Sequence, residues 1–272
     1  MSENQIDDAP VMEMAISVST AGGDLIDAYD VRGTHDHFRT RFPNASRAPS
    51  FQGIEPFPEP GSMVAPQQAQ FLPFTGTEPN RWWFESEGHS HLLQVQENFV
   101  ARNWRRINLP PDAPAEKYPG YEALKADFTE SITILRDQAE RDNRAFPTPS
   151  ACELLYDNMI YIGDENSQIR IKDVLPIFQF SDGYRRYGIN TSWVQVDPTW
   201  TGENSLQIQT NISGLGAQVA GQIRSFLRVM FVARTAIDTW DAVPDAFDTA
   251  HVAVTKLLPS LTGGQVRANW SQ

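Results

Sequence analysis

The stretch that most constrains the fold of this chain runs from residue 82 to residue 142, where three short strands precede one long helix. The strands are predicted over residues 82–86, 91–96 and 99–106. After them, five apolar residues recur at offsets that place them on one helix face: Tyr121, Leu124, Phe128, Ile132 and Leu135. Consecutive strands followed by an amphipathic helix predict an α+β unit in which the helix lies on the sheet.

The same order of elements recurs along the chain. Residues 11–142 are predicted to form a strand, a short helix, three strands and a long helix, and residues 151–262 a strand, a short helical turn, three strands and a long helix. This recurrence predicts an internal duplication. We therefore expect an α+β fold of duplicated strand–helix–three-strand–helix units, forming a curved antiparallel sheet that two long helices pack on one face.

The second half is less sharply defined than the first. Strands are predicted over residues 151–162, 187–196, 206–212 and 222–234, with a short helix over 171–178 and a helical stripe over 247–261. Gly214 and Gly216 are expected to break the chain after the third strand. A helix is the alternative for residues 222–234, because Phe226, Met230 and Ala233 also fit helical spacing.

The domain organisation follows from these elements. Residues 1–9 are expected to be a disordered leader, and residues 10–146 and 150–272 to be two halves of one folding unit. Residues 43–80 are rich in proline and lack periodicity, which predicts a long irregular loop inside the first half. Such a loop is either a functional lid or a mobile excursion.

Composition narrows the classes of function. The net charge of −12 is expected to repel nucleic-acid phosphates and anionic membranes. No run of about 18 apolar residues is present, which predicts no membrane span. The single cysteine, Cys152, excludes an internal disulfide and a multi-cysteine zinc site. Together with an acidic N-terminus unlike a signal peptide, these features predict a cytoplasmic protein.

Two pairs of histidines could bind a metal, His35 with His37 and His89 with His91, because alternate strand positions point the same way. The alternative is solvated histidines at turns, and we expect neither a metal nor a cofactor. His251, on the stripe of the last helix, is expected to be a hydrogen-bonded core histidine. A nucleophile pair with Cys152 is its alternative, and we predict no catalytic residue.

Two rows of alternating arginine and aromatic residues supply the predicted binding residues. They are Arg102, Trp104 and Arg106 in the first half, and Arg224, Phe226 and Arg228 in the second. A tight turn at Glu97-Asn98 would bury the first row under the helices, whereas a one-residue bulge would leave it on the open face. We favour the bulge, because exposed arginines keep their hydration. The alternative reading of both rows is a solvated sheet face.

Several short motifs are spread over most of the chain. They are Pro10-Val11-Met12-Glu13, Arg41-Phe42-Pro43, Leu93-Gln94-Val95-Gln96 with Phe99 and Trp104, Tyr118-Pro119-Gly120-Tyr121, and Asp248 to His251 with Trp270. In these motifs the chain resembles a sporadically distributed family of uncharacterised bacterial and archaeal proteins of about this length. The resemblance implies a single folding unit in a prokaryotic cytoplasm and brings no catalytic residues. At the level of topology, the predicted fold is similar to the TATA-binding-protein-like and helix-grip architectures, which carry no function by themselves.

Three functions remain open from the sequence. The first is a non-enzymatic protein-interaction module that binds a protein partner through the sheet face, the proline-rich loop or both. The second is a cavity between sheet and helices that binds a small ligand or catalyses a reaction. The third is single-stranded nucleic-acid binding by the arginine and aromatic rows, which the acidic net charge disfavours. Homo-oligomerisation stays open.

Overall fold

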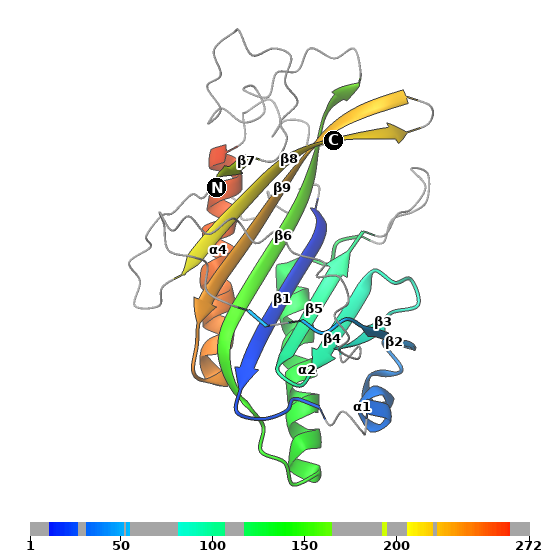
Figure 1. Ribbon diagram of the computed structural model, residues 1–272, viewed down its shortest axis with the longest axis vertical. Coiled ribbons are helices and arrows are strands. Elements are labelled where there is room, and N and C mark those ends of the chain that lie inside the picture. Colours follow the sequence, from blue (N-terminus) through cyan, green and yellow to red (C-terminus); the bar gives the residue numbers. More distant parts are fainter. Residues whose placement is uncertain are drawn as a thin grey trace.

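A computed structural model describes residues 11–26, 31–51, 53–54, 81–106, 117–164, 192–194, 206–219 and 222–261 (Figure 1). The first half contains β1 (Val11–Ala21), α1 (Val31–Phe38), β2 (Asn44–Ala48), β3 (Arg81–Glu85), β4 (His91–Gln96), β5 (Phe99–Arg105) and α2 (Tyr121–Arg141). The second half contains β6 (Thr148–Asp164), β7 (Ser192–Val194), β8 (Gln207–Val219), β9 (Gln222–Ala236), the 3-10 turn η3 (Trp240–Ala242) and α4 (Val243–Leu261).

The described strands form one antiparallel sheet in the order β2-β3-β4-β5-β1-β6-β9-β8-β7. Outward from β1 the order is β5, β4, β3 and β2, and outward from β6 it is β9, β8 and β7. The predicted α+β class with a curved antiparallel sheet is therefore confirmed. This strand order is what two similar halves would give, and the internal duplication itself stays a prediction.

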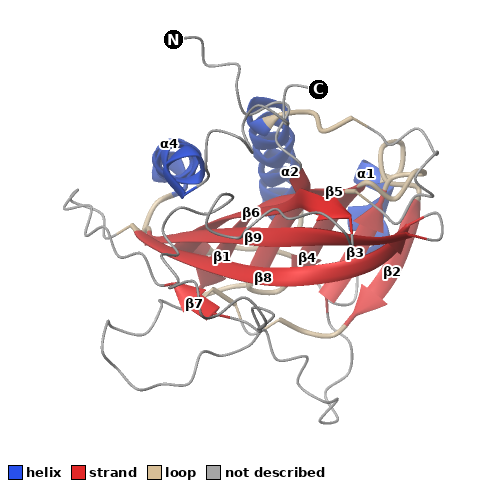
Figure 2. Cartoon of the chain, turned by 90° about the horizontal axis from the view of Figure 1, so that it is seen from above, coloured by secondary structure: helices blue, strands red, loops and turns tan. Residues whose placement is uncertain are grey.

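The long helices and the sheet make two layers (Figure 2). Both α2 and α4 lie on the same side of the sheet, where α2 contacts β5 and β1 and α4 contacts β6 and β9. The main hydrophobic core fills the space between the layers. Alternate residues of the central strands point into it, among them Met14, Ile16, Val18, Leu154, Val229 and Phe231. On the helices, Phe128 meets Phe247 edge to face with ring centroids 5.4 Å apart.

The strands predicted over residues 82–86, 91–96, 99–106 and 151–162 and the two long helices correspond closely to described elements, whereas only Ser192–Val194 of the strand predicted over 187–196 is described. The strand reading of residues 222–234 is correct and the helical alternative is wrong, since these residues lie in β9. The break at Gly214 and Gly216 is also wrong. β8 continues to Val219 because β9 pairs with it over its whole length, with Gly214 opposite Leu227 and Gly216 opposite Ser225. A glycine weakens a strand, but a neighbouring strand holds its backbone in the ladder.

The predicted loop over residues 43–80 contains a strand. β2 pairs with β3 in a regular register from Asn44↔Glu85 to Ala48↔Arg81. Its residues are exposed except for Ala48, so no apolar alternation marked it in the sequence. Pro43 and Pro49 flank the strand and do not interrupt it. Residues 52 and 55–80 of the loop lie outside the described residues, as do the leader and the short helix predicted over 171–178.

The register of the β4–β5 hairpin contradicts the bulge that we favoured from the sequence. Gln96 pairs with Phe99 and Val95 with Val100, so Glu97-Asn98 is a tight two-residue turn. Leu93 then pairs with Arg102, and Arg102 lies on the side of the sheet that the helices cover. Burial of Arg102 is favourable because its guanidinium donates to the carboxylate of Asp127 in α2.

Candidate functional site

We call the side of the sheet opposite α2 and α4 the open face. In its centre, β6 and β9 present four partly exposed apolar side chains: Leu155, Met159, Phe226 and Met230. They alternate with the buried residues of the same strands and take no part in the main core, because successive strand residues point to opposite faces. We refer to these four residues as the β6–β9 patch.

Charged residues frame the β6–β9 patch in bonded pairs. Arg228 donates to both carboxylate oxygens of Asp157 from Nε at 2.9 and 3.0 Å and from Nη2 at 2.7 Å. Its side chain is 46% exposed, whereas that of Asp157 is 9% exposed. The hydrogen bonds with Asp157 raise the pKa of Arg228 above its ordinary value. Arg234 Nε donates to Glu153 at 2.7 Å further along the strands. These guanidinium groups are therefore held in fixed positions.

A buried polar network lies where the two halves of the sheet meet. Glu13 in β1 is directly opposite Asp157 in β6, and it accepts a hydrogen bond of 2.7 Å from Asn103 Nδ2. Gln94 Nε2 donates in turn to Asn103 Oδ1 at 2.8 Å. Burial raises the pKa of Glu13 above its ordinary value, and the Asp157 carboxylate adds to that shift. The network holds β4, β5 and β1 together on the open face.

A short segment covers another part of the open face. Phe51 and Ile54 pack on Phe99 and Ala101 as a small second cluster. The backbone N–H of Ile54 donates to Ser19 Oγ at 2.7 Å, and Gln96 exchanges two hydrogen bonds with the backbone of Phe51. Phe51 and Ile54 thus occupy the open face at β5 and leave the β6–β9 patch outside this cluster.

Arg102 and Trp104 are buried, so the predicted first row is not a surface. Each has 0% of its side chain exposed. Arg102 donates to Leu92 O at 3.2 Å, to Asn103 O at 2.9 Å, to His91 Nδ1 at 2.8 Å and to Asp127 Oδ2 at 3.3 Å. Its guanidinium also stacks over Phe42 at 4.8 Å. An exposed arginine was expected from the sequence because burial removes the hydration of its charge. The carboxylate of Asp127 in α2 offsets that loss.

The remaining predicted binding residues are divided between different places. Arg106 follows β5 and is exposed, and its backbone N–H donates to Met12 O at 2.7 Å. Phe226 and Arg228 lie on the open face. Arg224 lies in β9 opposite Asp164, and its side chain is outside the described ones. Arg102 and Trp104 therefore point to the opposite face from Phe226 and Arg228, and these four residues do not form one symmetric surface.

The histidines make contacts with other protein groups. His35 Nε2 lies 2.8 Å from Phe42 O, His37 Nε2 accepts from Arg141 at 2.9 Å, and His89 Nδ1 lies 3.3 Å from Glu85. Among the described residues, no three His, Cys, Asp or Glu side chains lie close enough together to hold a metal ion. Cys152 is buried in β6, and burial raises the pKa of its thiol. A thiol with a raised pKa stays protonated at neutral pH and is therefore a poor nucleophile.

A polar cluster between α2 and α4 was not foreseen from the sequence. Tyr121 Oη donates to Asp248 Oδ1 at 2.6 Å, and Lys125 Nζ donates to the same oxygen at 2.5 Å. His251 stacks on Tyr121 with ring centroids 3.9 Å apart, and its Nδ1 lies 2.8 Å from Tyr156 Oη. His251 is partly buried, and burial lowers its pKa.

This cluster connects the two halves of the chain. Burial raises the pKa of Tyr121, so its hydroxyl stays protonated and continues to donate to Asp248. Burial opposes the carboxylate of Asp248, but the hydrogen bonds from Lys125 and Tyr121 outweigh it and lower the pKa. The only sequence signal was Tyr121 and His251 on two helix stripes far apart in the chain, with Lys125 and Asp248 on the same helices. We assign the cluster to helix–helix contact.

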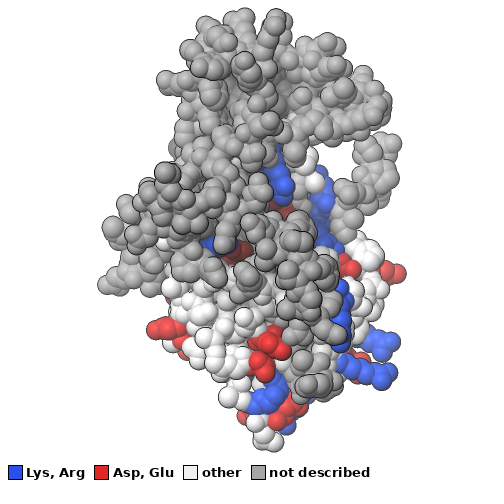
Figure 3. Space-filling model, viewed as in Figure 1, with Lys and Arg blue, Asp and Glu red and all other residues white. Residues whose placement is uncertain are grey.

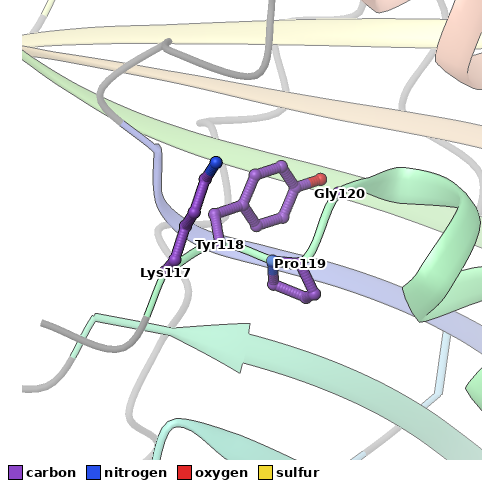
Figure 4. Close-up of a pocket in the computed structure, with 4 residues that line it drawn as sticks. All are labelled: Lys117, Tyr118, Pro119 and Gly120. Carbon is purple, nitrogen blue, oxygen red and sulfur yellow. The ribbon is translucent and has the colours of Figure 1, made fainter.

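A shallow hollow lies beside the start of α2. It is lined by residues Lys117, Tyr118, Pro119 and Gly120 (Figure 4). The Tyr118 hydroxyl donates to Met14 Sδ at 2.6 Å, and its ring lies 5.2 Å from that of Trp104. Tyr118 thus closes one end of the main core.

Comparison of the chain with protein-family models, with curated proteins and with solved structures finds no match. Within the described residues, no helix is both long and apolar enough to cross a membrane.

Proposed function

We propose that this chain is a non-enzymatic protein-interaction module that holds a protein partner on the open face of its sheet. The observation that carries the proposal is the β6–β9 patch. Leu155, Met159, Phe226 and Met230 are partly exposed apolar residues on a sheet face whose charged neighbours already have partners. We further propose a cytoplasmic setting, on the grounds of charge and cysteine content.

The chemistry of the patch suits a protein surface. Methionine and aromatic side chains are enriched in protein interfaces, and arginine is the charged residue most often found there. Arg228 is already oriented by Asp157, so less side-chain entropy is lost when a partner contacts it. Because Arg228 and Asp157 are paired, a partner that covers them does not bury an unpaired charge.

A photo-cross-linking experiment tests the proposal. The residue p-benzoyl-phenylalanine is placed at position 230 in the patch, and at Val252, an exposed apolar residue of α4, as the matched control. Illumination in the native host is expected to give a discrete adduct from position 230 and none from position 252.

A second substitution makes the test specific. Phe226→Ser in the position-230 variant should remove the adduct while the melting temperature stays near that of the parent, because Phe226 lies outside the main core. Equal adducts from both positions, or no adduct from position 230 in folded protein, would contradict the proposal.

A further inference from the structure

β2 is an edge strand that other described strands leave open on one side. It stands at the end of the strand order, and four of its five residues, Asn44 to Arg47, are exposed. Its register with β3 is regular over five pairs, without a bulge, and no proline lies within it. Bulges and internal prolines prevent many natural edge strands from pairing with another chain, and β2 has neither. β2 thus offers unprotected backbone N–H and C=O groups to a further strand.

Two arginines stand beside this edge, one on each face of the sheet. Arg47 in β2 is exposed and stacks over Trp82 at 4.8 Å. Arg81 in β3 pairs with Ala48 and therefore points to the opposite face from Arg47, with its guanidinium 5.9 Å from Phe51 and 5.7 Å from Trp83. Neither arginine has an ion-pair partner among the described residues.

Arg81 is the more unusual of the two. It is partly buried, and its Nε is fully buried without a hydrogen-bond partner. Burial lowers the pKa of its guanidinium. An arginine of this kind gains from an incoming anion more than an arginine that is already paired.

The surroundings of β2 are basic in an otherwise acidic protein. Residues 31–50 hold four arginines and one acidic residue, although the whole chain has a net charge of −12. Arg39 and Arg41 pair with carboxylates, whereas Arg32 and Arg47 have no ion-pair partner among the described residues. Lys and Arg side chains, with several Asp and Glu side chains among them, lie along the right-hand border of the described surface in Figure 3, on the side where Figure 1 shows α1, β2 and β3. Such a local field favours an acidic ligand.

We propose that β2 binds an extended acidic segment of a partner protein as an additional strand of the sheet. The backbone of β2 supplies the ladder, and the side chains supply the specificity. Residues next to each other in an added strand point to opposite faces. Two adjacent carboxylates in the segment can therefore reach Arg47 on the helix side and Arg81 on the open face. This site is separate from the β6–β9 patch, and neither proposal depends on the other.

A second copy of this chain is the less favoured occupant of the edge. Antiparallel pairing of β2 with itself around Ser46 would place the two Arg47 side chains as diagonal neighbours on one face. Like charges at such positions are destabilising. An acidic segment replaces that repulsion with two ion pairs.

Fluorescence anisotropy with the full chain tests the proposal. The probe is a labelled eight-residue peptide with two adjacent glutamates between threonines and valines, and the control peptide has lysines in place of the glutamates. The glutamate peptide is expected to bind more tightly, and its affinity should fall with added salt. Arg47→Glu with Arg81→Glu should weaken binding by about tenfold or more. Arg47→Glu alone, at an exposed position, gives a variant whose folding is not at risk.

Arg136→Glu is the matched control, because Arg136 also stacks on an aromatic ring, Phe146, but lies on α2. It should leave the affinity within about twofold of the parent, since it changes the net charge as much as Arg47→Glu alone does and lies away from β2.

Proline variants test the strand addition itself. N–H groups of successive residues in a strand point in opposite directions, so one of Ala45→Pro and Ser46→Pro removes an outward donor and spares the ladder with β3. The variant that keeps the parental melting temperature should lose peptide binding, and the peptide should slow hydrogen exchange at residues 44–48 of the parent.

Several results would overturn the proposal. They are equal binding of the lysine peptide, no binding of the glutamate peptide, and an equal loss of affinity in the Arg136→Glu control. Sedimentation that shows a dimer dissociated by the same proline variant would assign the edge to a second copy instead. None of these results bears on cross-linking from position 230.

Discussion

At the residue scale, Arg102 illustrates how a partner distant in the sequence decides the orientation of a side chain. Asp127 of α2 accepts from Arg102 and also pairs with Arg41, and the ring of Phe42 lies against the same guanidinium. The strand residues Leu92 and Asn103 supply carbonyl acceptors. A fully buried arginine is retained in a core only where its charge and most of its donors find partners in this way.

Arg102→Glu should unfold the protein or make it insoluble, because it places a second carboxylate beside Asp127 in a fully buried site. Arg102→Ala should lower the free energy of unfolding by about 3–5 kcal/mol, since it leaves Asp127 without one of its cations. Chemical denaturation measures both. Arg106→Glu, at the exposed end of the same strand, should change stability by about 0.5 kcal/mol or less. Equal losses of stability from Arg102→Glu and Arg106→Glu would show that the register of β4 and β5 is wrong.

His251 should make stability depend on pH. Its pKa in the folded protein is lowered by burial, so below its ordinary pKa of 6.5 the unfolded chain binds more protons than the folded one. The contribution of His251 to stability is therefore complete above about pH 6.5 and decreases as the pH falls. Urea unfolding at pH 5 to 8 should show a decline in the parent that is smaller in His251→Gln.

Comparing the parent with His251→Gln separates the effect of His251 on stability from that of Glu13. Burial raises the pKa of Glu13, which gives the opposite trend, with stability decreasing as the pH rises above its ordinary pKa of 4.5. Both proteins contain Glu13, so its contribution cancels in their difference. Parallel stability curves for the parent and His251→Gln would contradict the assignment.

At the scale of elements, α2 and α4 meet each other as well as the sheet. Phe128 and Phe247 are 2% and 1% exposed and form an edge-to-face pair between the two helices. On the same side, Tyr121 and Lys125 of α2 reach Asp248 of α4. Aromatic pairs of this geometry contribute beyond the area that they bury.

Phe128→Ala and Phe247→Ala should each lower the free energy of unfolding by about 3–5 kcal/mol, because each leaves a cavity in the main core. Since the two rings touch, the double variant should lose less than the sum of the two single losses, by about 0.5–1.5 kcal/mol. Val252→Ala, on the exposed side of α4, is the control and should change stability little. Additive losses would mean that the rings do not interact.

At the scale of the whole molecule, β1 and β6 form the seam between the halves. They pair antiparallel from Val11↔Asn158 to Ala21↔Thr148, and Glu13 meets Asp157 across the seam. The α2–α4 cluster is a second connection between the same halves. Without β1, β6 would become a long exposed edge strand.

We therefore predict that the two halves unfold together. Far-ultraviolet circular dichroism and tryptophan fluorescence should give coincident urea transitions, because neither half can lose its structure without exposing the seam. Trp104 of the first half is buried in the shared core and reports on it directly. Two separated transitions would indicate two independent domains and contradict the single folding unit.

The sequence by itself determined the order and type of the main elements. β1, β4, β5, α2, β6, β9 and α4 all lie where the periods of two and 3.6 residues predict them, because these periods are local properties of the chain. The helical stripe of α2 also identified Leu124, Phe128 and Leu135 as core residues. The sequence missed β2, since an exposed edge strand carries no apolar alternation.

The tertiary structure alone decided which face each strand presents. β5 carries Val100, Arg102 and Trp104 on one side and Phe99, Ala101 and Asn103 on the other, and all six are buried. The types of residue on the two faces of β5 therefore do not show which face the helices cover. A carboxylate 25 residues along the chain, Asp127, makes burial of Arg102 favourable, while Arg228 in the matching strand finds Asp157 on the opposite face. The orientation depends on long-range pairing of charges, for which the local sequence holds no signal.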